Sequence, residues 1–300
     1  MAAHFGGRSS PRVNIDYLVI GNITKDMQPD GSWRLGGTGA YSALAARRMG
    51  YRAALVTRAD ENVPLETLLP GVQVHRLPAD VSTTFENIYN GNARTQWLKA
   101  WAPPISFEDI PPAWRDAPIV HLGPIAQECD PRMAVHFPNA LVGATPQGWL
   151  RAWDDEGRVF FRPLANPAEA LAHIDALVFS LEDVQGNRNA LHALVNAVPI
   201  AVVTCADEGC LVFAEGETWR VHARPVAHVV DPTGAGDVFA TAFFLRYAEC
   251  RDILDAARFA NVAASFAVEG VGVEAVPNRE RIHAWLAEQT LPIEQVVEWR

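Results

Sequence analysis

The chain has 300 residues, of which 49% are hydrophobic, and its 35 acidic against 25 basic residues give a formal net charge of −10. This length fits one large α/β domain or two small ones, and the hydrophobic share is enough for a substantial core. The acidic balance argues against nucleic acid or an anionic membrane as the main partner, although a nest of backbone N–H groups still allows a small anionic ligand.

The first two thirds of the chain predict alternating strands and helices. A strand is expected over residues 13–21, a helix over 37–50, and a second strand over 52–58. Short apolar runs, typical of strands buried on both faces of a parallel sheet, follow at 118–122, 140–144, 174–180 and 199–204. Helical stretches separate several of these runs, so the pattern predicts a doubly wound, mostly parallel α/β sheet flanked by helices.

Residues 82–103 break this alternation. Two β-prone runs flank Asn90-Gly91, which is a strong signal for a hairpin turn. We expect a small β flap over residues 82–101, laid over the edge of the main sheet of a single domain that spans 1–300. An ordinary surface hairpin is the alternative.

The last third is expected to begin with strands and to end with helices. Residues 210–223 predict a strand pair that turns at Glu215-Gly216, and residues 228–231 predict a third, short strand. Two helices follow, and the second, rich in alanine, is expected to end near Gly270.

The stretch DPTGAGDVFATAFF, residues 231–244, carries most of the chemistry. A Gly-rich turn at the carboxyl end of a strand leads into a helix whose first N–H groups lack internal partners, which suits a phosphate or a developing oxyanion. Asp237 stands directly after this turn, where a phosphate would repel it unless it accepts a proton from an attacking hydroxyl group. The alternative is that Asp237 only caps the helix.

This stretch resembles the C-terminal signature of the PfkB, or ribokinase-like, carbohydrate kinases. LVIGNITKD and LGGTGAYSALAARRMG resemble the first strand and the di-glycine segment of that family, and VVTCADEGCLVF and FANVAASFAVEGVG its nucleotide side. The resemblance spans about residues 13–277. It implies a ribokinase-like fold and an ATP- and Mg²⁺-dependent kinase with K⁺ as a further ion. It also implies that the flap at 82–101, with parts of 22–38, is a β lid inserted over the acceptor site, which often pairs subunits into a homodimer.

The resemblance also implies a role for each matching residue. Asp237 would be the catalytic base, with Gly234, Ala235 and Gly236 forming the anion hole. The residues implied for the acceptor are Asp26, Gly36, Gly37, Tyr41 and Glu128. The residues implied for the nucleotide are Ser180, Asp183, Thr204, Gly209, Asn261 and Gly272. Asp183 would also hold Mg²⁺ through water, and Asp231 and Thr233 match positions that bind a monovalent cation.

Departures from the family pattern bear on the acceptor. Thr38 and Tyr41 stand where ribokinases carry Lys and Asn, and Tyr41 is too bulky to imitate an amide that reaches a furanose hydroxyl. The Asn-x-x-Glu motif of the family is replaced by Ser180-Leu181-Glu182-Asp183. Together with residues 144–159, these features look most like myo-inositol kinases, so a cyclitol or another polyol is the first acceptor that we expect.

Ribose, nucleosides and sugar phosphates are alternative acceptors, and a non-catalytic ligand sensor on the same fold is the rival interpretation. The sequence has no P-loop, no G-x-G-x-x-G and no paired His spacing of a zinc site. Residues 154–158 are expected to form a hairpin turn rather than a calcium loop. Four scattered cysteines, the lack of an apolar leader and the lack of a membrane-length apolar run favour a cytoplasmic protein.

Overall fold

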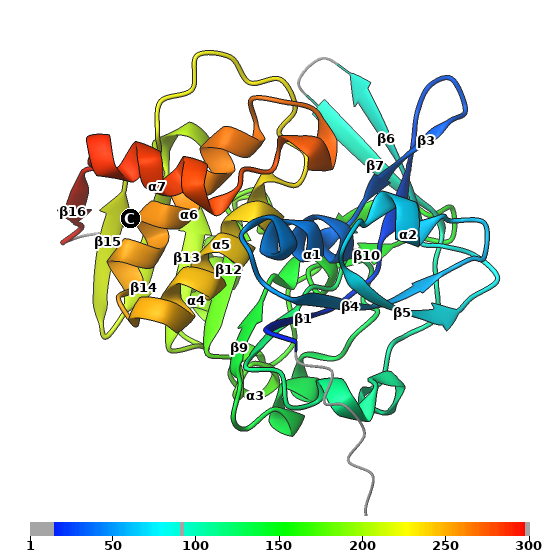
Figure 1. Ribbon diagram of the computed structural model, residues 1–300. Coiled ribbons are helices and arrows are strands. Elements are labelled where there is room, and N and C mark those ends of the chain that lie inside the picture. The colour runs from blue at the N-terminus through cyan, green and yellow to red at the C-terminus, as the bar shows by residue number, and fades with distance from the viewer. Residues whose placement is uncertain (1–14, 91–92, 298–300) are drawn as a thin grey trace, which may run out of the picture.

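A computed structural model of the chain describes residues 15–90 and 93–297 and shows one large sheet between helices (Figure 1). In these residues the sheet has ten strands in the order β16-β15-β14-β13-β12-β9-β8-β1-β4-β5. Their bounds, in that order, are Ile293–Gln295, Glu217–Val221, Cys210–Ala214, Ile200–Thr204, Ala176–Ser180, Leu141–Ala144, Ile119–Leu122, Tyr17–Ile20, Ala53–Ala59 and Gln73–Pro78. The seven strands from β13 to β5 are parallel, and β14, β15 and β16 are antiparallel. The expected doubly wound, mostly parallel sheet is confirmed.

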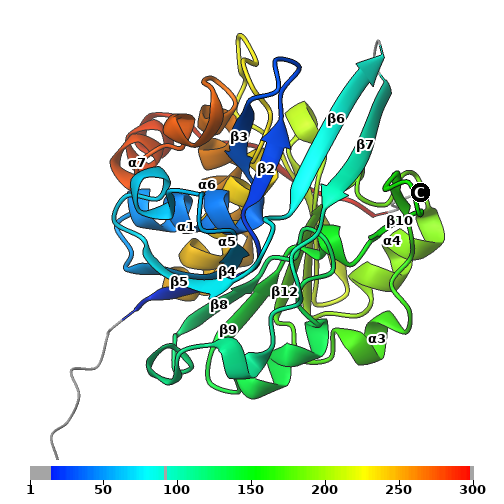
Figure 2. The same ribbon diagram turned by 90° about the vertical axis from the view of Figure 1, so that its right-hand side faces the viewer.

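Helices cover both faces of this sheet (Figure 2). One face carries α1 (Thr38–Arg48), α2 (Leu65–Leu68), α5 (Ala235–Cys250), α6 (Ile253–Ala267) and α7 (Arg279–Glu288). The other face carries α3 (Pro167–Ala170), α4 (Arg188–Val195) and the 3₁₀ helices η1 (Phe107–Asp109), η2 (Pro112–Trp114), η3 (Pro131–His136) and η4 (Pro146–Gly148). Two further 3₁₀ helices are η5 (Ala206–Glu208) and η6 (Gly272–Ala275).

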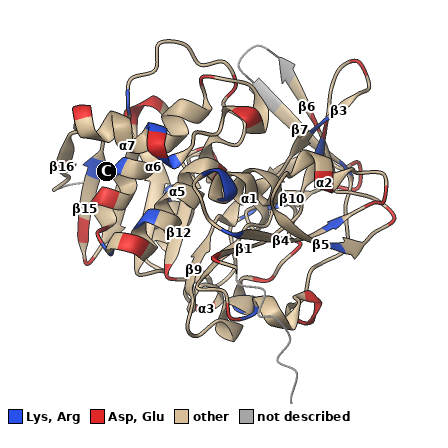
Figure 3. Ribbon diagram, viewed as in Figure 1, with Lys and Arg blue, Asp and Glu red and all other residues tan. Residues whose placement is uncertain are grey.

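Alternation along the strands builds a separate core on each face. In β1, Tyr17 and Val19 pack with α1, α5 and α6, whereas Leu18 and Ile20 pack on the α4 side, and all four are fully buried. Each such side chain contributes roughly 1.5–3 kcal/mol through burial of its apolar surface. Figure 3 shows that Lys, Arg, Asp and Glu gather on helices and loops around these strands.

A second sheet stands beside the large one and projects from it (Figure 2). Its strands lie in the order β3-β2-β6-β7, with the bounds Trp33–Gly36, Thr24–Met27, Thr84–Asn90 and Ala93–Ala100. These are the segments from which the β lid is expected. The Asn90-Gly91 turn itself falls partly outside the described residues.

A hairpin of β10 (Arg151–Trp153) and β11 (Val159–Phe161) lies against the second sheet. The Leu98 amide of β7 donates a hydrogen bond of 2.7 Å to the Gly157 carbonyl, and Trp97 forms a β-bridge with Arg158. The expected turn at residues 154–158 is confirmed, since the Asp154 carboxylate accepts the Arg158 N–H at 2.8 Å.

Two expectations for the last third are wrong. Residues 228–231 are not a strand, because Val229 and Val230 lie in an irregular loop and are 62% and 56% exposed. The Val230 amide donates to the Val268 carbonyl at 2.8 Å, so this segment is bonded to the end of α6 rather than to a strand. The tail also contains three helices and β16 rather than two helices alone, and α5 begins at Ala235, two residues before Asp237. The Gly-rich motif therefore follows a loop rather than a strand.

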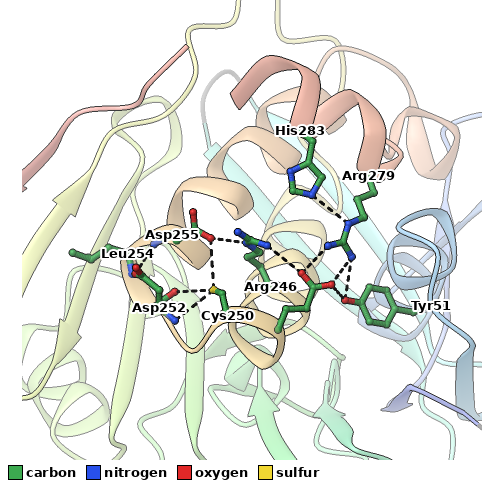
Figure 4. A network of polar contacts seen from close by, with 9 residues as sticks. Tyr51, Arg246, Cys250, Asp252, Leu254, Asp255, Arg279 and His283 are labelled. Atoms are coloured by element: carbon green, nitrogen blue, oxygen red, sulfur yellow. Dashed lines mark hydrogen bonds and ion pairs between the residues drawn. The ribbon is translucent and has the colours of Figure 1, made fainter. Parts of the chain in front are cut away.

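A network of charges joins the C-terminal end of α5 to its neighbours (Figure 4). Glu249 accepts from Arg279 at 2.7 Å and from Arg246 at 3.3 Å, and it also bonds the Tyr51 hydroxyl. Arg246 in turn pairs with Asp255 of α6. Although burial opposes the effect, these donors hold the pKa of Glu249 below its usual value.

In the part of the chain that the structure describes, no helix is both long and apolar enough to cross a membrane.

Candidate active site

The N-terminus of α5 is formed by the Gly-rich turn. Gly234 precedes the helix with a φ of 77°, a left-handed conformation that favours glycine. A Cβ at Gly234 would lie 2.1 Å from a ring carbon of Tyr41, so the ring packs directly on the turn. Ala235, Gly236 and Asp237 are the first three helical residues. Asp237 therefore does not cap the helix, and its side chain is left for another task.

The carboxyl group of Asp237 has a raised pKa. Burial raises this pKa to about 6, and the negative charge of Asp183 adds to the rise, while Thr38 and Arg151 oppose it. The residue keeps partial contact with solvent, so the surrounding protein lowers the local polarity without shutting water out. A carboxyl group with a pKa near 6 is a better proton acceptor than an ordinary Asp and is still mostly ionised at neutral pH.

The turn before α1 faces the same place. A Cβ at Gly36 would lie 2.2 Å from an Asp26 carboxylate oxygen, so the missing side chain makes room for that carboxylate. Gly37 has a φ of 86°, and a Cβ there would lie 2.6 Å from the Asn22 carbonyl oxygen. Burial raises the pKa of Tyr41, and the charges of Asp231, Asp237 and Asp26 add to that rise. Asp26, both glycines and Tyr41 thus lie with Asp237 in one site.

Two hydroxyl groups on α1 are buried without a partner. Within the described residues, neither Thr38 Oγ1 nor Ser42 Oγ has a hydrogen-bond partner, although both residues are almost fully buried. Thr38 still lies near enough to Asp237 to lower its pKa, so the two groups face each other beyond good hydrogen-bonding geometry. A buried hydroxyl without a partner costs free energy. A bound ligand group or water at Thr38 would relieve that cost.

A buried polar chain beneath α5 holds the helix in place. The Tyr17 hydroxyl donates to Thr241 at 3.2 Å and bonds His121 at 2.9 Å, and the other ring nitrogen of His121 bonds Thr145 at 3.1 Å. Burial lowers the pKa of His121 to about 3, so the ring is neutral. Thr241 lies one helical turn after Asp237, and the chain therefore fixes the first turns of α5 on the sheet.

The Glu128 carboxylate is occupied by backbone N–H groups. It accepts from Asn22 at 2.7 Å, from Ala126 at 2.7 Å and from Ile125 at 2.9 Å. Burial raises the pKa of Glu128, and these hydrogen bonds oppose the rise. Glu128 thus joins the loop after β8 to the residue that precedes the second sheet, and a ligand would compete with these N–H groups for its oxygens.

Ser180 and Asp183, both expected to bind the nucleotide, form a closed turn at the end of β12. Asp183 Oδ2 accepts from the Ser180 amide at 2.8 Å and from its hydroxyl at 2.9 Å. The other Asp183 oxygen accepts from Gln147 at 3.2 Å. The short Asp side chain is held in place by this turn, and its charge reaches Asp237.

Thr204, Gly209 and Asn261 form a second group, beside β13 and β14. Gly209 has a φ of 94°, and a Cβ there would lie 2.1 Å from the Val221 carbonyl oxygen. The Asn261 amide is buried and donates to that same carbonyl at 3.0 Å. Thr204 ends β13 directly before this turn. The Asn261 side chain thus fastens α6 to β15.

Asp231, Thr233 and Gly272 form a third group that joins two loops. The Thr233 amide donates to Asp231 Oδ1 at 2.9 Å, and the Gly272 amide donates to Asp231 Oδ2 at 3.3 Å. The Val230 amide donates to the Val268 carbonyl at 2.8 Å. In the described residues no cluster of three or more His, Cys, Asp or Glu side chains is grouped to hold a metal ion.

Two further residues reach the site, Gln147 and Arg151, which the sequence analysis included only as members of the segment 144–159. Both lie in the segment after β9, and neither belongs to a motif that marks a ligand. Gln147 bonds Asp183, and the charge of Arg151 reaches Asp237. Only the folded chain brings these positions together, so the sequence marks the segment but does not single out these two side chains.

Comparison with known proteins agrees with this architecture. Residues 164–280 match the model of the pfkB family carbohydrate kinase. A cytidine kinase from Thermococcus kodakarensis is 26% identical over 263 residues, covering 81% of this chain and 92% of that protein. A pyrophosphate-dependent kinase in the ribokinase family, solved with a pyrophosphate analog and myo-inositol, aligns with a TM-score of 0.75 at 21% identity over 90% of this chain and 100% of that one. Arabidopsis thaliana ribokinase, solved with ribose and ATP, gives 0.69 at 21% identity over 90% and 98%.

The fold defines the class, because the chain has the ribokinase-like α/β fold of these two solved structures. Residues 164–280 contain a PfkB family carbohydrate kinase domain, and the chain is a phosphotransferase, a carbohydrate or nucleoside kinase. The rival interpretation as a non-catalytic sensor is not retained, because the matched family model and these relatives are kinases.

Proposed function

We propose that the chain transfers the γ-phosphoryl group of ATP to a hydroxyl group of a small polyol, with a myo-inositol-like cyclitol as the first acceptor. The observation that carries this proposal is the position of Asp237. Its carboxyl group lies in the first turn of α5, beside a Gly-rich turn, and its pKa is raised to about 6. A proton acceptor at the positive end of a helix dipole suits attack of a hydroxyl group on a phosphoryl group.

In the proposed reaction, the acceptor hydroxyl loses its proton to Asp237 as its oxygen forms a bond to the γ-phosphorus. The bond between the γ-phosphorus and the bridging oxygen breaks, and ADP leaves. Gly234, Ala235 and Gly236 would provide backbone N–H groups for the oxygens of the transferred group, because amides at the start of a helix lack the usual helical acceptors; the Ala235 amide, which donates to the Pro232 carbonyl at 3.2 Å, would have to share that bond.

The residues around Asp183 fit a Mg²⁺ ion. The charge of Asp183 adds to the rise in the pKa of Asp237, so two carboxylates lie near each other at this end of the site. Mg²⁺ is bound in such sites through one or two carboxylates together with substrate phosphates and water, and it would neutralise phosphate charge. Asp183 would hold the ion through water, with the Ser180 turn and Gln147 fixing the carboxylate.

The loops around the third group favour a nucleotide donor. Val229, Val230 and Val271 are 62%, 56% and 53% exposed, and the hydrogen bonds from Val230 to Val268 and from Gly272 to Asp231 bring their loops together. Exposed apolar side chains at one place offer a surface that a nucleotide base would cover. A donor that consists of phosphate alone would leave them in water. Thr204, Gly209, Asn261 and Gly272 would shape this side.

The acceptor side favours a neutral polyol. Asp26 and Asp237 are carboxylates that accept hydrogen bonds from hydroxyl groups, and at Tyr41 the charges of Asp231, Asp237 and Asp26 are opposed by Arg34 alone. Gly36 and Gly37 let the acceptor approach the backbone, and Tyr41 forms the wall next to the Gly-rich turn. Ribose, nucleosides and sugar phosphates remain the alternative acceptors.

A panel of acceptors and donors tests the proposal. Pentoses, hexoses, cyclitols, nucleosides and sugar phosphates would be tried with ATP and with pyrophosphate, and product phosphate ester would be measured. Turnover of a cyclitol with ATP and Mg²⁺ is expected. Exclusive use of pyrophosphate would refute ATP as the donor. Exclusive use of an anionic acceptor would refute a neutral polyol as the acceptor. Running the panel in KCl, NaCl and a large organic cation tests whether Asp231 and Thr233 hold K⁺, since equal rates would mean that they only shape the turn.

The second sheet is proposed to be a lid over the acceptor, which would exclude water from the phosphoryl group. Amide hydrogen exchange over residues 82–90 and 93–97 is expected to slow when the acceptor binds. Equal exchange with and without acceptor would contradict a lid.

The same sheet is the proposed contact of a homodimer, and the proposed location is the cytoplasm. Cys129 and Cys210 are buried and all four thiols are free, which supports a reducing compartment.

A further inference from the structure

A fully buried imidazole ring lies at the centre of the polar chain beneath α5. His121 belongs to β8, and like Tyr17 and Thr241 it has no exposed surface. Its ring meets the Phe244 ring of α5 edge-on, with the ring centroids 5.1 Å apart. An apolar side chain would fill this place without the cost of burying two polar nitrogens. The hydrogen bonds of His121 therefore call for a reason beyond filling the core.

The hydrogen bonds of the polar chain determine which ring nitrogen carries the proton. The Tyr17 hydroxyl donates its only proton to Thr241 Oγ1 at 3.2 Å. The 2.9 Å contact between the Tyr17 oxygen and His121 Nδ1 is then a hydrogen bond only if Nδ1 is the donor. Because the buried ring is neutral, Nε2 has no proton and accepts from the Thr145 hydroxyl at 3.1 Å. Every hydrogen bond of the polar chain is thus donated in one direction, from Thr145 towards α5.

The two ends of the polar chain lie beside two carboxylates of the site. Thr241 follows Asp237 by four residues in α5, so the two side chains project from the same face of that helix. At the other end, Thr145 directly precedes η4, whose Gln147 bonds Asp183 at 3.2 Å. Three consecutive hydrogen bonds therefore connect the helix that carries the proposed base with the segment that contacts the second carboxylate.

We propose that His121, with its proton on Nδ1, is a positioning residue that sets the place of Asp237 relative to Asp183 and to the phosphoryl group delivered by ATP, an inference that rests on the proposed function. The bond from Tyr17 to Thr241 opposes rotation of α5 about its own axis, and such a rotation would move the Asp237 carboxylate. A misplacement of about 1 Å costs roughly 100-fold in rate. Ground-state binding of ATP and of the acceptor depends on other groups, so the loss falls on kcat rather than on KM.

A role of His121 in stability alone makes a different prediction. Removal of any hydroxyl that anchors α5 would then lower the free energy of unfolding, and kcat of the folded enzyme would stay the same. The tautomer of the ring would also be without consequence for turnover. Two measurements, one on the ring and one on the reaction, separate these roles.

The first measurement is the tautomer of His121 in the ligand-free protein, read by ¹⁵N NMR of histidine-labelled material. Burial lowers the pKa of His121 to about 3, so its ring stays neutral at pH 5, where exposed histidines are protonated. A neutral ring whose signals also shift in Tyr17→Phe identifies the residue. We expect a proton on Nδ1 and none on Nε2. The opposite tautomer would overturn the inference, because the Tyr17 hydroxyl would then donate to His121 and not to Thr241.

The second measurement compares the steady-state kinetics of Tyr17→Phe and Tyr51→Phe with ATP, Mg²⁺ and myo-inositol. Both variants lose one hydroxyl that anchors α5, and the Tyr51 hydroxyl bonds Glu249 at the opposite end of the helix (Figure 4). Tyr17→Phe should lower kcat roughly 10- to 100-fold and change KM for either substrate less than about twofold. Tyr51→Phe should keep kcat within about twofold of the unsubstituted protein.

Thr241→Val is a second variant that breaks the same bond, and it gives the same comparison if Tyr17→Phe does not fold. It should reproduce the fall in kcat, and the double variant should be no slower than either single one, because all three lack one shared interaction. Fully additive losses would overturn the inference, since the two side chains would then act separately.

The remaining outcomes distinguish this inference from the proposed function. Unchanged kcat in Tyr17→Phe and Thr241→Val would overturn the inference and leave the proposed function intact. An equal fall in kcat in Tyr51→Phe would also overturn it, because general loosening of α5 would then be the cause. No turnover of myo-inositol by the unsubstituted protein would refute the proposed function, and the positioning of Asp237 with it, while the NMR result would still decide the tautomer.

Discussion

The two ends of α5 have opposite electrostatic character. At the C-terminal end, Glu249 pairs with Arg279 and Arg246, and Arg246 also pairs with Asp255 (Figure 4). At the N-terminal end, Asp237 is raised in pKa by burial and by a second carboxylate, and the hydroxyls of Thr38 and Ser42 have no hydrogen-bond partners among the described residues.

This difference separates stability from activity along one helix. Opposite charges within hydrogen-bonding distance stabilise the fold, whereas a half-buried carboxylate beside another one destabilises it. Proteins retain such unfavourable groups where a ligand later uses them. The ion pairs at the C-terminal end compensate for the stability lost at the N-terminal end, because both ends belong to the same sixteen-residue helix. Substitutions at the two ends should therefore change different measurements.

The largest effect is expected for Asp237→Asn. Loss of a positioned base costs roughly 10²–10⁴ in turnover, while ADP affinity should change little. Thermal stability should stay equal or rise, because the variant removes a buried charge. The matched control is Glu249→Gln at the other end of the helix, which should keep turnover and lose stability. Retention of full turnover by Asp237→Asn would show that another group accepts the proton.

Gly234→Ala and Gly236→Ala should differ although they lie two residues apart. A Cβ at Gly234 would meet the Tyr41 ring at 2.1 Å, and its φ of 77° strains any other residue, so a loss of about 1–3 kcal/mol in the free energy of unfolding is expected. At Gly236 a Cβ meets nothing within 4 Å, and alanine in a helix is favoured by about 0.5–1 kcal/mol. Chemical denaturation measures both. Equal destabilisation would mean that Tyr41 does not pack on the turn.

Arg279→Met is expected to lower stability by about 1 kcal/mol without changing turnover, because it breaks a partly buried network that joins α5, α7 and the end of α1. Arg132→Met is the control, because its pair with Asp130 is much more exposed, with side-chain exposures of 70% and 49%. Urea denaturation at neutral pH would compare the two. If the control lost as much, the network would carry no special stability.

The smallest effect is a pair of opposite slopes with pH. The folded-state pKa of Asp237 is about 6, above the usual 3.8. Between these values the folded chain keeps a proton that the unfolded chain has lost, so this group makes stability fall as pH rises from about 4 to 6. Over the same range kcat/KM should rise, because the base becomes ionised. Asp237→Asn should remove this fall in stability between about pH 4 and 6. An unchanged pH dependence of stability would show that Asp237 is not the group that titrates.

The sequence was sufficient for the parts of the fold that depend on local pattern. The apolar runs at 118–122, 140–144 and 199–204 are strands because a parallel sheet buries both of their faces. The strand predicted at residues 228–231 is wrong, because it rested only on the β-prone side chains of Val229 and Val230. A short apolar run becomes a strand only where it lies alongside another strand, and the sequence does not show that the Val230 amide bonds the Val268 carbonyl at the end of α6 instead.

The site was predictable only where a motif spans a few neighbouring residues. Gly36, Gly37 and the turn before Asp237 could be named in advance, because a glycine turn and the helix that follows are local features. The packing of Tyr41 on Gly234 and the approach of Arg151 to Asp237 join segments far apart in the chain. Such contacts depend on how α1, α5 and β10 are placed by the sheet.

The hydrogen bond from Leu98 to the Gly157 carbonyl couples two parts of the enzyme mechanically. It fastens β7 of the second sheet to the hairpin whose first residue is Arg151. Any displacement of the second sheet by an acceptor is therefore transmitted to the strand that carries the guanidinium group. An acceptor of the wrong shape would displace the second sheet, and with it the β10–β11 hairpin, too little or too far. The enzyme would then select its acceptor through the rate of phosphoryl transfer as well as through binding affinity.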